Sequence, residues 1–220
     1  MAAQVIAALQ QKGGAGKSTM LMSMAGSMAR DGAEVLMIDT DPQQNVVSWA
    51  RKHESDRLSA LEILDEKILI PKVEEYHEQF DVILIDTAGY ESQMATYVLV
   101  VADLVMIPVG TSEGTLKGAM TTLEHVHRVT KAHAHPPAAY LAPWNIKRQT
   151  RIAEKLRSLA DESGHPVLRE QVGDYVGFHD MTWGGELPAG AAGKAIRGFM
   201  AELQMRSLLT FYRNDETEAA

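Results

Sequence analysis

The sequence predicts an α/β fold, a doubly wound and mostly parallel sheet with helices on both faces. Short apolar runs recur along the chain, and segments with apolar residues at helical spacing separate them. Polar or glycine-rich segments directly follow three of these runs. Strands that alternate with helices form parallel sheets covered on both faces, and ligands bind beyond the carboxyl ends of such strands.

The strands are predicted from continuous apolar runs, which are typical of strands that are buried on both faces. The first run covers residues 5–9, and later runs cover residues 35–38, 60–64, 82–85, 104–109 and 138–142. A short further strand is expected near residues 167–169. Polar or turn residues follow the clearest runs, such as Asp86 after residues 82–85 and Gly110 after residues 104–109.

The helices are predicted where apolar residues recur every three or four positions. In residues 18–30 these are Met20, Leu21, Met24 and Met28. Further helices are expected at residues 45–54, 73–80, 93–101, 115–132, 149–163, 174–182 and 194–212. Residues 1–213 are therefore expected to form a single domain. The short acidic segment 214–220 lacks large apolar residues and is expected to be a disordered tail.

Composition limits the classes of protein that fit. The chain has 220 residues, 45% of them hydrophobic and 23% charged, as is usual for one globular domain. It contains no cysteine, which excludes a disulfide framework and a thiolate metal site. No apolar run is long enough to cross a bilayer, and the N-terminal residues lack the basic start of a signal peptide. The net charge of −8 means that any DNA contact requires a local basic patch.

The segment after the first predicted strand carries the strongest functional signal. Residues 12–19 are Lys-Gly-Gly-Ala-Gly-Lys-Ser-Thr, and a predicted helix follows them. Glycines allow backbone N–H groups to surround phosphate oxygens, and the helix N-terminus favours negative charge. The Lys17 ammonium is placed to reach the β- and γ-phosphates, and the Ser18 hydroxyl to bind Mg²⁺. The expected nucleotide-binding residues of this loop are Gly13, Gly14, Ala15, Gly16, Lys17, Ser18 and Thr19.

Two acidic segments follow the next clear apolar runs. Asp39-Thr40-Asp41-Pro42-Gln43 comes after residues 35–38, and Asp86-Thr87-Ala88-Gly89 comes after residues 82–85. Because the carboxyl ends of parallel strands meet at one edge of a sheet, these segments are expected to lie beside the glycine-rich loop. Three segments in this order and context predict a nucleotide site.

The loop departs from the ordinary phosphate-binding pattern and resembles that of a specific family. Gln11 stands where the ordinary pattern has its first glycine, and Lys12 is an additional lysine. This deviant Walker A motif resembles that of the ParA/MinD ATPases, as do the Asp-x-Asp-Pro-Gln segment and the Walker B-like Asp86 segment. The first strand begins near residue 5, which leaves no room for an N-terminal helix-turn-helix domain. The resemblance is therefore to the small, ParF-like plasmid partition ATPases.

The resemblance implies roles for individual residues. Lys12 is expected to contact the phosphates bound by a partner subunit, so that catalysis requires a homodimer. Ser18 is expected to bind Mg²⁺ directly, and Asp86, with Asp39 through water, is expected to hold the outer shell of the metal. Asp41 is the candidate for orienting or activating the water that attacks ATP. The expected catalytic residues are thus Lys12, Lys17 and Asp41, with ATP and Mg²⁺ as cofactors.

Recognition of adenine and of DNA is less strongly indicated. Asn145, and Pro188 in the loop at residues 186–188, are candidates for adenine contact, although ordinary turn chemistry explains both equally well. The DNA-binding candidates are the basic residues Lys147, Arg148, Arg151 and Lys155, with Arg157 beside them. Such patches bind phosphate backbones without sequence preference. The alternative is a solvated helix face, and the family resemblance favours DNA.

Three other motifs allow alternative interpretations. Residues 110–114 match the Gly-x-Ser-x-Gly pattern of serine hydrolases, but no segment resembles an oxyanion-hole motif. The His-x-His pairs at 125/127 and 133/135 are expected to be surface histidines, because positions i and i+2 of a helix face different directions. The last helix is apolar, but an acidic tail follows it, so docking on the sheet is favoured over membrane binding.

The sequence as a whole predicts a ParA-type ATPase. The resemblance implies an ATP-dependent sandwich dimer that binds DNA nonspecifically and positions a cargo, most simply a plasmid. It implies slow hydrolysis that a centromere-binding or cargo adaptor protein stimulates, and a cytoplasmic, nucleoid-associated location. The alternatives are a positioning ATPase for a chemoreceptor cluster or a microcompartment, and a MinD-like membrane-bound regulator.

Overall fold

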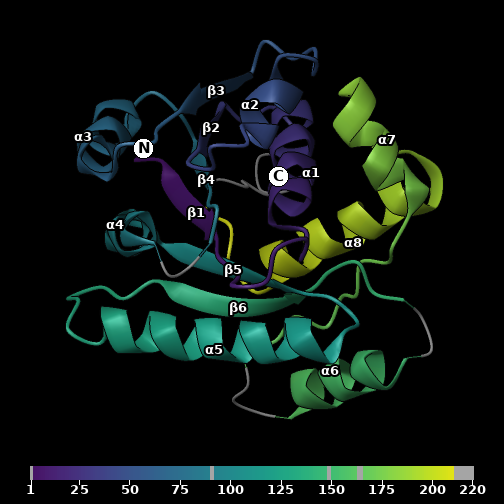
Figure 1. Cartoon of the computed structure of the whole chain (residues 1–220). Coiled ribbons are helices and arrows are strands. Elements are labelled where there is room, and N and C mark those ends of the chain that lie inside the picture. The colour runs from purple at the N-terminus through teal and green to yellow at the C-terminus, as the bar shows by residue number, and fades with distance from the viewer. Residues whose placement is uncertain (1, 90–91, 148–149, 163–165, 211–220) are drawn as a thin grey trace, which may run out of the picture.

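A six-stranded, fully parallel sheet organises the chain in the computed structural model, which describes residues 2–89, 92–147, 150–162 and 166–210 (Figure 1). The strands lie in the order β3-β2-β4-β1-β5-β6. They are β1 (Gln4–Ala8), β2 (Val35–Asp39), β3 (Leu58–Glu62), β4 (Val82–Asp86), β5 (Leu104–Val109) and β6 (Ala138–Pro143). The helices of the described residues are α1 (Lys17–Arg30), α2 (Asn45–Ala50), α3 (Glu66–Tyr76), α4 (Gln93–Val101), α5 (Glu113–Thr130), α6 (Arg151–Asp161), α7 (Val176–Gly184) and α8 (Gly190–Met205).

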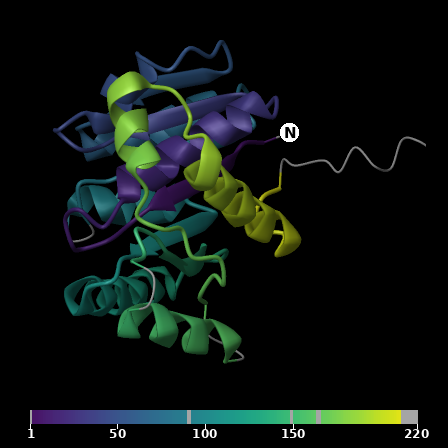
Figure 2. The same cartoon turned by 90° about the vertical axis from the view of Figure 1, so that its right-hand side faces the viewer.

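Helices cover both faces of the sheet, which confirms the predicted doubly wound architecture. One core contains α1, α2, α7 and α8, and the other contains α3, α4, α5 and α6 (Figures 1 and 2). Side chains of β1 alternate between the two cores, with Ile6 in the first and Val5 and Ala7 in the second. The alternation follows from the two-residue period of a strand, and burial on both faces explains why β1 is apolar throughout.

Strand register brings the acidic strand ends together. Asp39 at the end of β2 pairs with Asp86 at the end of β4, and Asp86 also pairs with Ala8 at the end of β1. The crossing from β1 to β2 contains α1, which packs on one face of the sheet. The crossing from β4 to β5 contains α4, which packs on the opposite face. The crevice at the carboxyl end of β1 is therefore the switch point at which open α/β sheets bind ligands.

Six of the seven predicted strands and most of the predicted helices are present among the described residues, but several boundaries were wrong. The helix expected at residues 73–80 begins at Glu66, because the Asp65 side chain accepts a hydrogen bond from Lys67 N at 3.0 Å and caps it. The helix expected at 194–212 begins at Gly190 and ends at Met205, since Ser207 adopts a positive φ of 55°. Residues 167–169 supply only an isolated bridge between Val167 and Leu141. The predicted tail at 214–220 lies outside the described residues.

Candidate functional site

The glycine-rich loop connects β1 to α1 and leaves the helix N-terminus open. Gly16 is the N-cap residue with φ 96°, and α1 has no side-chain cap and no acidic residue in its first turn. A Cβ at Gly16 would lie 2.6 Å from Cδ1 of Trp144, so glycine is required by both backbone conformation and space. The first N–H groups of α1 therefore remain available to an anion.

Ser18 and Asp86 meet at the base of this loop. The Ser18 hydroxyl donates to Oδ2 of Asp86 at 2.5 Å. The other carboxylate oxygen, Oδ1, is buried and has no hydrogen-bond partner among the described residues. Burial raises the pKa of Asp86 to about 7, and the hydrogen bond from Ser18 opposes that rise. A buried, unpartnered carboxylate oxygen beside a hydroxyl is a donor set that fits Mg²⁺, which proteins hold with one or two carboxylates and substrate phosphates.

Lys17 lies beside these acids. Its ammonium is 3.5 Å from the carbonyl oxygen of Ala88, and its side chain is almost fully buried. Burial lowers the pKa of Lys17, while the negative charges of Asp86 and Asp41 raise it. The lysine is therefore a desolvated cation at the open end of α1, close enough to two carboxylates for their charges to raise its pKa. A phosphate group there would add negative charge around it.

Asp39 has a structural role that the sequence analysis missed. Its Oδ2 accepts hydrogen bonds from the backbone N–H groups of Val46 and Val47 at 2.8 and 3.2 Å, and its Oδ1 accepts one from Asp41 N at 3.1 Å. Burial raises the pKa of Asp39, and these backbone hydrogen bonds lower it. Asp39 thus fixes the first turn of α2 against the end of β2. A contact through water to a metal at Asp86 remains a proposal.

A cavity of about 640 Å³ extends from the loop along α1. The predicted site residues that line it are Gly13, Gly14, Ala15, Gly16, Lys17, Ser18, Thr19, Asp41 and Asn145. Sequence reasoning missed the remaining lining residues, which include Asn45, Ser48 and Lys52 on or after α2, and His179, Thr182 and Trp183 on α7. The volume is in the range of small-molecule sites in proteins.

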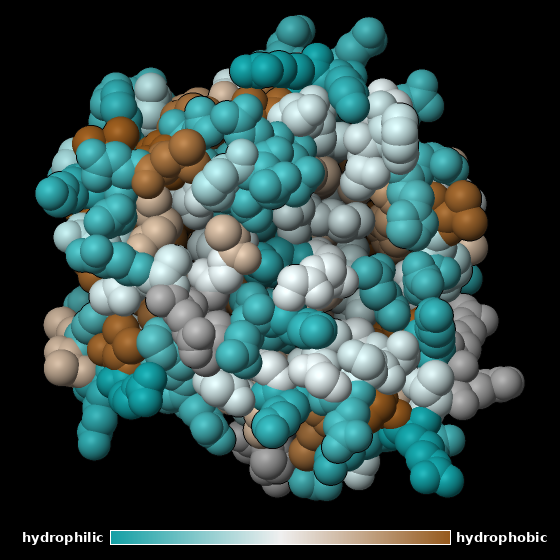
Figure 3. Space-filling model, viewed as in Figure 1, coloured by the Kyte–Doolittle hydropathy of each residue, from teal (hydrophilic) through white to brown (hydrophobic). Residues whose placement is uncertain are grey.

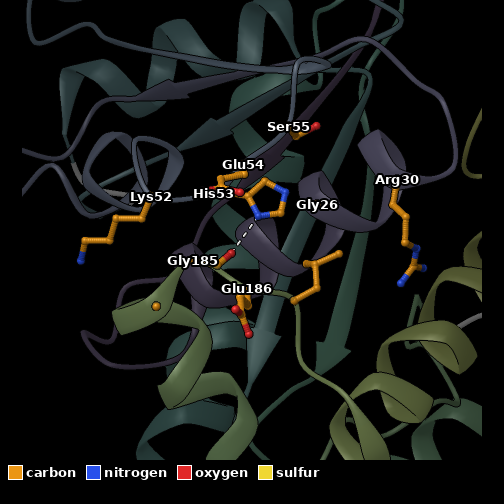
Figure 4. Close-up of a pocket in the computed structure, with 10 residues that line it drawn as sticks. Gly26, Arg30, Lys52, His53, Glu54, Ser55, Gly185 and Glu186 are labelled. Carbon is orange, nitrogen blue, oxygen red and sulfur yellow. Dashed lines mark hydrogen bonds between the residues drawn. The ribbon is translucent and has the colours of Figure 1, made fainter.

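Two predicted site residues, Lys12 and Pro188, do not line this cavity. Lys12 is exposed and does not line it, and no hydrogen bond or ion pair joins its ammonium to a described residue. Pro188 does not line it either, which does not support the predicted adenine contact. The Pro188 carbonyl oxygen packs against Gly193, where a Cβ would lie 2.5 Å away. The neighbouring Glu186 lines a second cavity of about 480 Å³ (Figure 4).

The basic cluster lies on and before α6. Arg151 and Lys155 are exposed on this helix, and Ala153 and Leu156 on its other face are buried. Lys147, before the helix, is also exposed. Arg148 lies outside the described residues. The arrangement presents cations to solvent at the end of the molecule formed by α5 and α6 (Figure 1).

The structure gives the other motifs ordinary roles. Ser112 of the Gly-x-Ser-x-Gly segment caps α5, and its hydroxyl accepts a hydrogen bond from Thr115 N. The described residues contain no group of three or more His, Cys, Asp or Glu side chains suited to a metal.

Ile196, Phe199 and Leu203 of α8 are buried in the core. No helix in the described segments is long and apolar enough to span a bilayer, and the face in Figure 3 is a mosaic of hydrophilic and smaller apolar patches.

Comparisons with known proteins identify relatives of this chain. A model of the AAA domain family matches residues 3–64 and 53–136. The ParA protein of Rhizobium radiobacter is 31% identical over 105 residues, which are 47% of this chain and 47% of that protein. The maintenance of carboxysome distribution protein A of Synechococcus elongatus is 24% identical over 204 residues, 71% of this chain and 80% of that protein. The chain thus spans about half the length of the ParA relative.

A solved structure shares the fold. The septum site-determining protein MinD of Pyrococcus horikoshii, complexed with Mg-ADP, superposes with a TM-score of 0.71 at 13% sequence identity. The superposition covers 96% of this chain and 99% of that one. The family match extends over more than half of the 220 residues and includes the deviant loop at residues 12–19. The chain belongs to the ParA/MinD family of P-loop ATPases.

Proposed function

We propose that this protein is a Mg²⁺-dependent ATPase that forms a sandwich dimer with ATP, binds DNA nonspecifically and positions a cargo. One observation carries the proposal. Lys17, Ser18 and the buried Asp86 converge at the uncapped N-terminus of α1, while Lys12 of the same loop is exposed and unpaired among the described residues. The first three residues form a site for a metal-bound polyphosphate, and the fourth is free to reach a second subunit.

The residues of the loop supply positioning and charge, which phosphoryl transfer requires more than covalent chemistry. The N–H groups of Gly13 to Ser18 and the Lys17 ammonium hold the phosphates. Ser18 and Asp86 would hold Mg²⁺, with Asp39 behind them, and a bound ion would neutralise charge on the phosphates. Asp41 lies on the cavity wall and is the residue proposed to orient the attacking water. Asn145, beside Gly16, is the proposed adenine contact.

Dimerisation is proposed from Lys12. An exposed lysine in a phosphate-binding loop that does not line its own cavity is suited to the phosphates of a facing subunit. Two bound nucleotides would then be shared across the interface, and hydrolysis would remove the contact that holds the dimer together. Slow hydrolysis and stimulation by a centromere-binding or adaptor protein are part of this proposal.

The proposed cargo is a plasmid, and the proposed location is the cytoplasm at the nucleoid. The ParA relative and the exposed cations of α6 support this choice. The carboxysome distribution relative supports a second candidate, a microcompartment as cargo, and a chemoreceptor cluster belongs to the same alternative. A MinD-like membrane role is disfavoured, because the apolar face of α8 is packed into the core.

Two single variants test the proposed function. Asp41→Ala should retain ATP binding and an ATP-dependent dimer, but its turnover should fall at least ~100-fold, the usual effect of losing a positioned base. Lys12→Ala should bind ATP with wild-type affinity and remain monomeric. The measurements are phosphate release, isothermal titration calorimetry and size-exclusion chromatography with light scattering.

Lys67→Ala is the matched control for the loss of one exposed lysine, since Lys67 lies on the distant helix α3. It should dimerise and hydrolyse ATP as the wild-type protein does. A Lys12→Ala protein that dimerises normally with ATP would refute the contact between subunits. Wild-type turnover by Asp41→Ala would refute the catalytic role of Asp41.

A further inference from the structure

One tryptophan is exposed at the wall of the nucleotide cavity. Trp183 is 82% exposed, whereas Trp49 and Trp144 are 1% and 0% exposed. Trp183 lies in the last turn of α7 and lines the cavity together with His179, one helical turn before it. Residues four positions apart share one face of a helix, so both rings belong to the face of α7 that borders the cavity. The Trp183 ring therefore offers a large aromatic surface to a group bound in the cavity.

The end of α7 is fixed rather than free. Gly185 closes the helix with φ 86°, and a Cβ there would lie 2.6 Å from the Lys52 carbonyl oxygen. The Gly185 carbonyl oxygen also lies 2.8 Å from Nδ1 of His53 (Figure 4). The His53 ring stacks on the buried Trp49 at 4.7 Å between centroids. The loop after α2 therefore holds the turn that follows Trp183, which keeps this indole at the edge of the cavity.

The two ends of the cavity differ in chemistry. At the loop end, Lys17, Ser18 and the open amides of α1 provide the charges and N–H groups that a phosphate needs. Along α2 and α7 the lining is polar or aromatic, with the Asn45 amide, the Ser48 and Thr182 hydroxyls and the His179 and Trp183 rings, and Lys52 follows α2. A flat, uncharged and partly apolar group fits the second end better than another phosphate does.

We propose that Trp183 is the stacking surface for the purine base of the bound nucleotide, with the α7 face as the wall of the base site. The proposal rests on the nucleotide function proposed above and adds a residue to it. Aromatic side chains stack on any base, because every base has a π-face. Trp183 therefore contributes affinity for adenine and guanine nucleotides alike, and discrimination between them depends on other residues.

The exposure pattern supplies a direct assay. Acrylamide should quench Trp183 in the free protein far more than the two buried tryptophans. Mg-ADP and Mg-GDP should protect Trp183 from quenching. Mg-pyrophosphate, which has phosphates but no base, should bind without protecting it. Light scattering of the same samples verifies that the protein is monomeric, so that a dimer contact does not produce the protection.

Substitutions then measure the contribution of the ring. Trp183→Ala should weaken ADP and GDP binding about 5- to 100-fold, as expected for the loss of one base–aromatic stack, and should leave pyrophosphate binding unchanged. Trp183→Phe should restore most of the affinity. Val176→Ala, which removes another exposed apolar side chain of α7 that does not line the cavity, is the matched control and should bind ADP normally.

Several results would overturn the proposal, and they separate it from the proposed function. Wild-type ADP affinity in Trp183→Ala, or quenching that ADP leaves unchanged, would remove Trp183 from the base site while the nucleotide function stands. Loss of the ATP-dependent dimer with normal ADP affinity would assign Trp183 to a subunit interface instead. Failure of the wild-type protein to bind either ADP or pyrophosphate would refute the nucleotide function itself.

Discussion

Asp86 illustrates the free-energy cost of burying a carboxylate. It is 1% exposed, and one oxygen has no hydrogen-bond partner among the described residues. Burial raises its pKa to about 7, so the charged form is disfavoured in the folded protein. The Lys17 ammonium compensates only part of this cost. A cation beside Asp86 would compensate more, which agrees with the proposed metal site.

The raised pKa predicts how stability depends on pH in metal-free protein. Between the unfolded pKa of 3.8 and the folded pKa of about 7, the native state holds a proton that the unfolded state has lost. The contribution of Asp86 to stability is therefore complete below pH 3.8 and is lost as pH rises toward 7. Asp86→Asn should be more stable than the wild-type protein at pH 8 by roughly 2–4 kcal/mol, with little difference near pH 4.

Urea unfolding in EDTA at several pH values measures this difference. Asp180→Asn removes an exposed carboxylate from α7 and is the control for a general effect of surface charge. Asp86→Asn should also lose Mg-ATP binding, so that one substitution raises stability and removes function. The same unfolding free energy for Asp86→Asn and wild type at pH 8 would contradict the burial argument.

Helix α6 has one buried apolar face and one exposed face that carries basic side chains. Its buried side chains, Ala153 and Leu156, attach it to the second core, and Arg151, Lys155 and Arg157 face solvent. In a protein with a net charge of −8, one such helix gives weak DNA binding. A dimer presents two of these helices and gains affinity through effective concentration.

DNA binding should therefore require ATP and decrease steeply with salt. Each phosphate contact adds about −0.9 to the slope of log affinity against log salt for duplex DNA. Arg151→Ala/Lys155→Ala should flatten this slope by about 2 for each subunit whose contacts are lost, and should leave ATP binding intact. Titration of labelled random-sequence duplex at several salt concentrations measures the slope.

The control removes the same charge elsewhere. Lys67→Ala/Lys131→Ala deletes two exposed lysines, from α3 and from the end of α5. If this variant and the α6 variant weaken DNA binding equally, net charge rather than the α6 surface is responsible. An α6 variant with the wild-type slope would place the DNA surface elsewhere.

In the whole molecule, the cavity joins elements that the chain keeps far apart. The loop after β1, helix α2, Asn145 and helix α7 all contribute to its wall. A nucleotide in this position would connect the N-terminal and C-terminal parts of the first core. Binding that requires the native arrangement stabilises the protein by mass action.

Mg-ATP should consequently raise the melting temperature. At a concentration one hundred times the dissociation constant, the stabilisation is about 2.7 kcal/mol, which corresponds to roughly 5–10 °C for a chain of this size. Lys17→Ala should show no shift with Mg-ATP, because it removes the buried cation at the phosphates. Differential scanning fluorimetry with and without ligand measures the shift.

The shift on adding ligand is the informative quantity, since removal of a desolvated lysine also changes the stability of the free protein. Burial lowers the pKa of Lys17, which means that the folded protein disfavours its charged form. Because Lys17→Ala removes this buried charge, the variant is expected to fold without ligand. Lys67→Ala should retain the full shift. A Lys17→Ala protein with the wild-type shift would show that nucleotide does not use this loop.

The sequence alone determined the features that depend on local chemistry. Continuous apolar runs predicted the strands of a sheet buried on both faces, and the glycines and Lys17 predicted the loop at the start of α1. Ser18 and Asp86 could be predicted to meet, because both follow strands whose carboxyl ends share one edge. Helix boundaries were less certain, since capping by Asp65 and the positive φ of Ser207 terminate helices without changing the apolar pattern.

Only the tertiary structure decided how the rest of the cavity is built. The Asp39 carboxylate accepts hydrogen bonds at the start of α2, Pro188 does not line the cavity, and Trp183 does. The contact that places Trp183 joins His53 to Gly185, which are 132 positions apart. Periodicity and motif spacing describe neighbours along the chain, whereas this contact depends on how α2 and α7 pack on the same face of the sheet, so no local pattern encodes it.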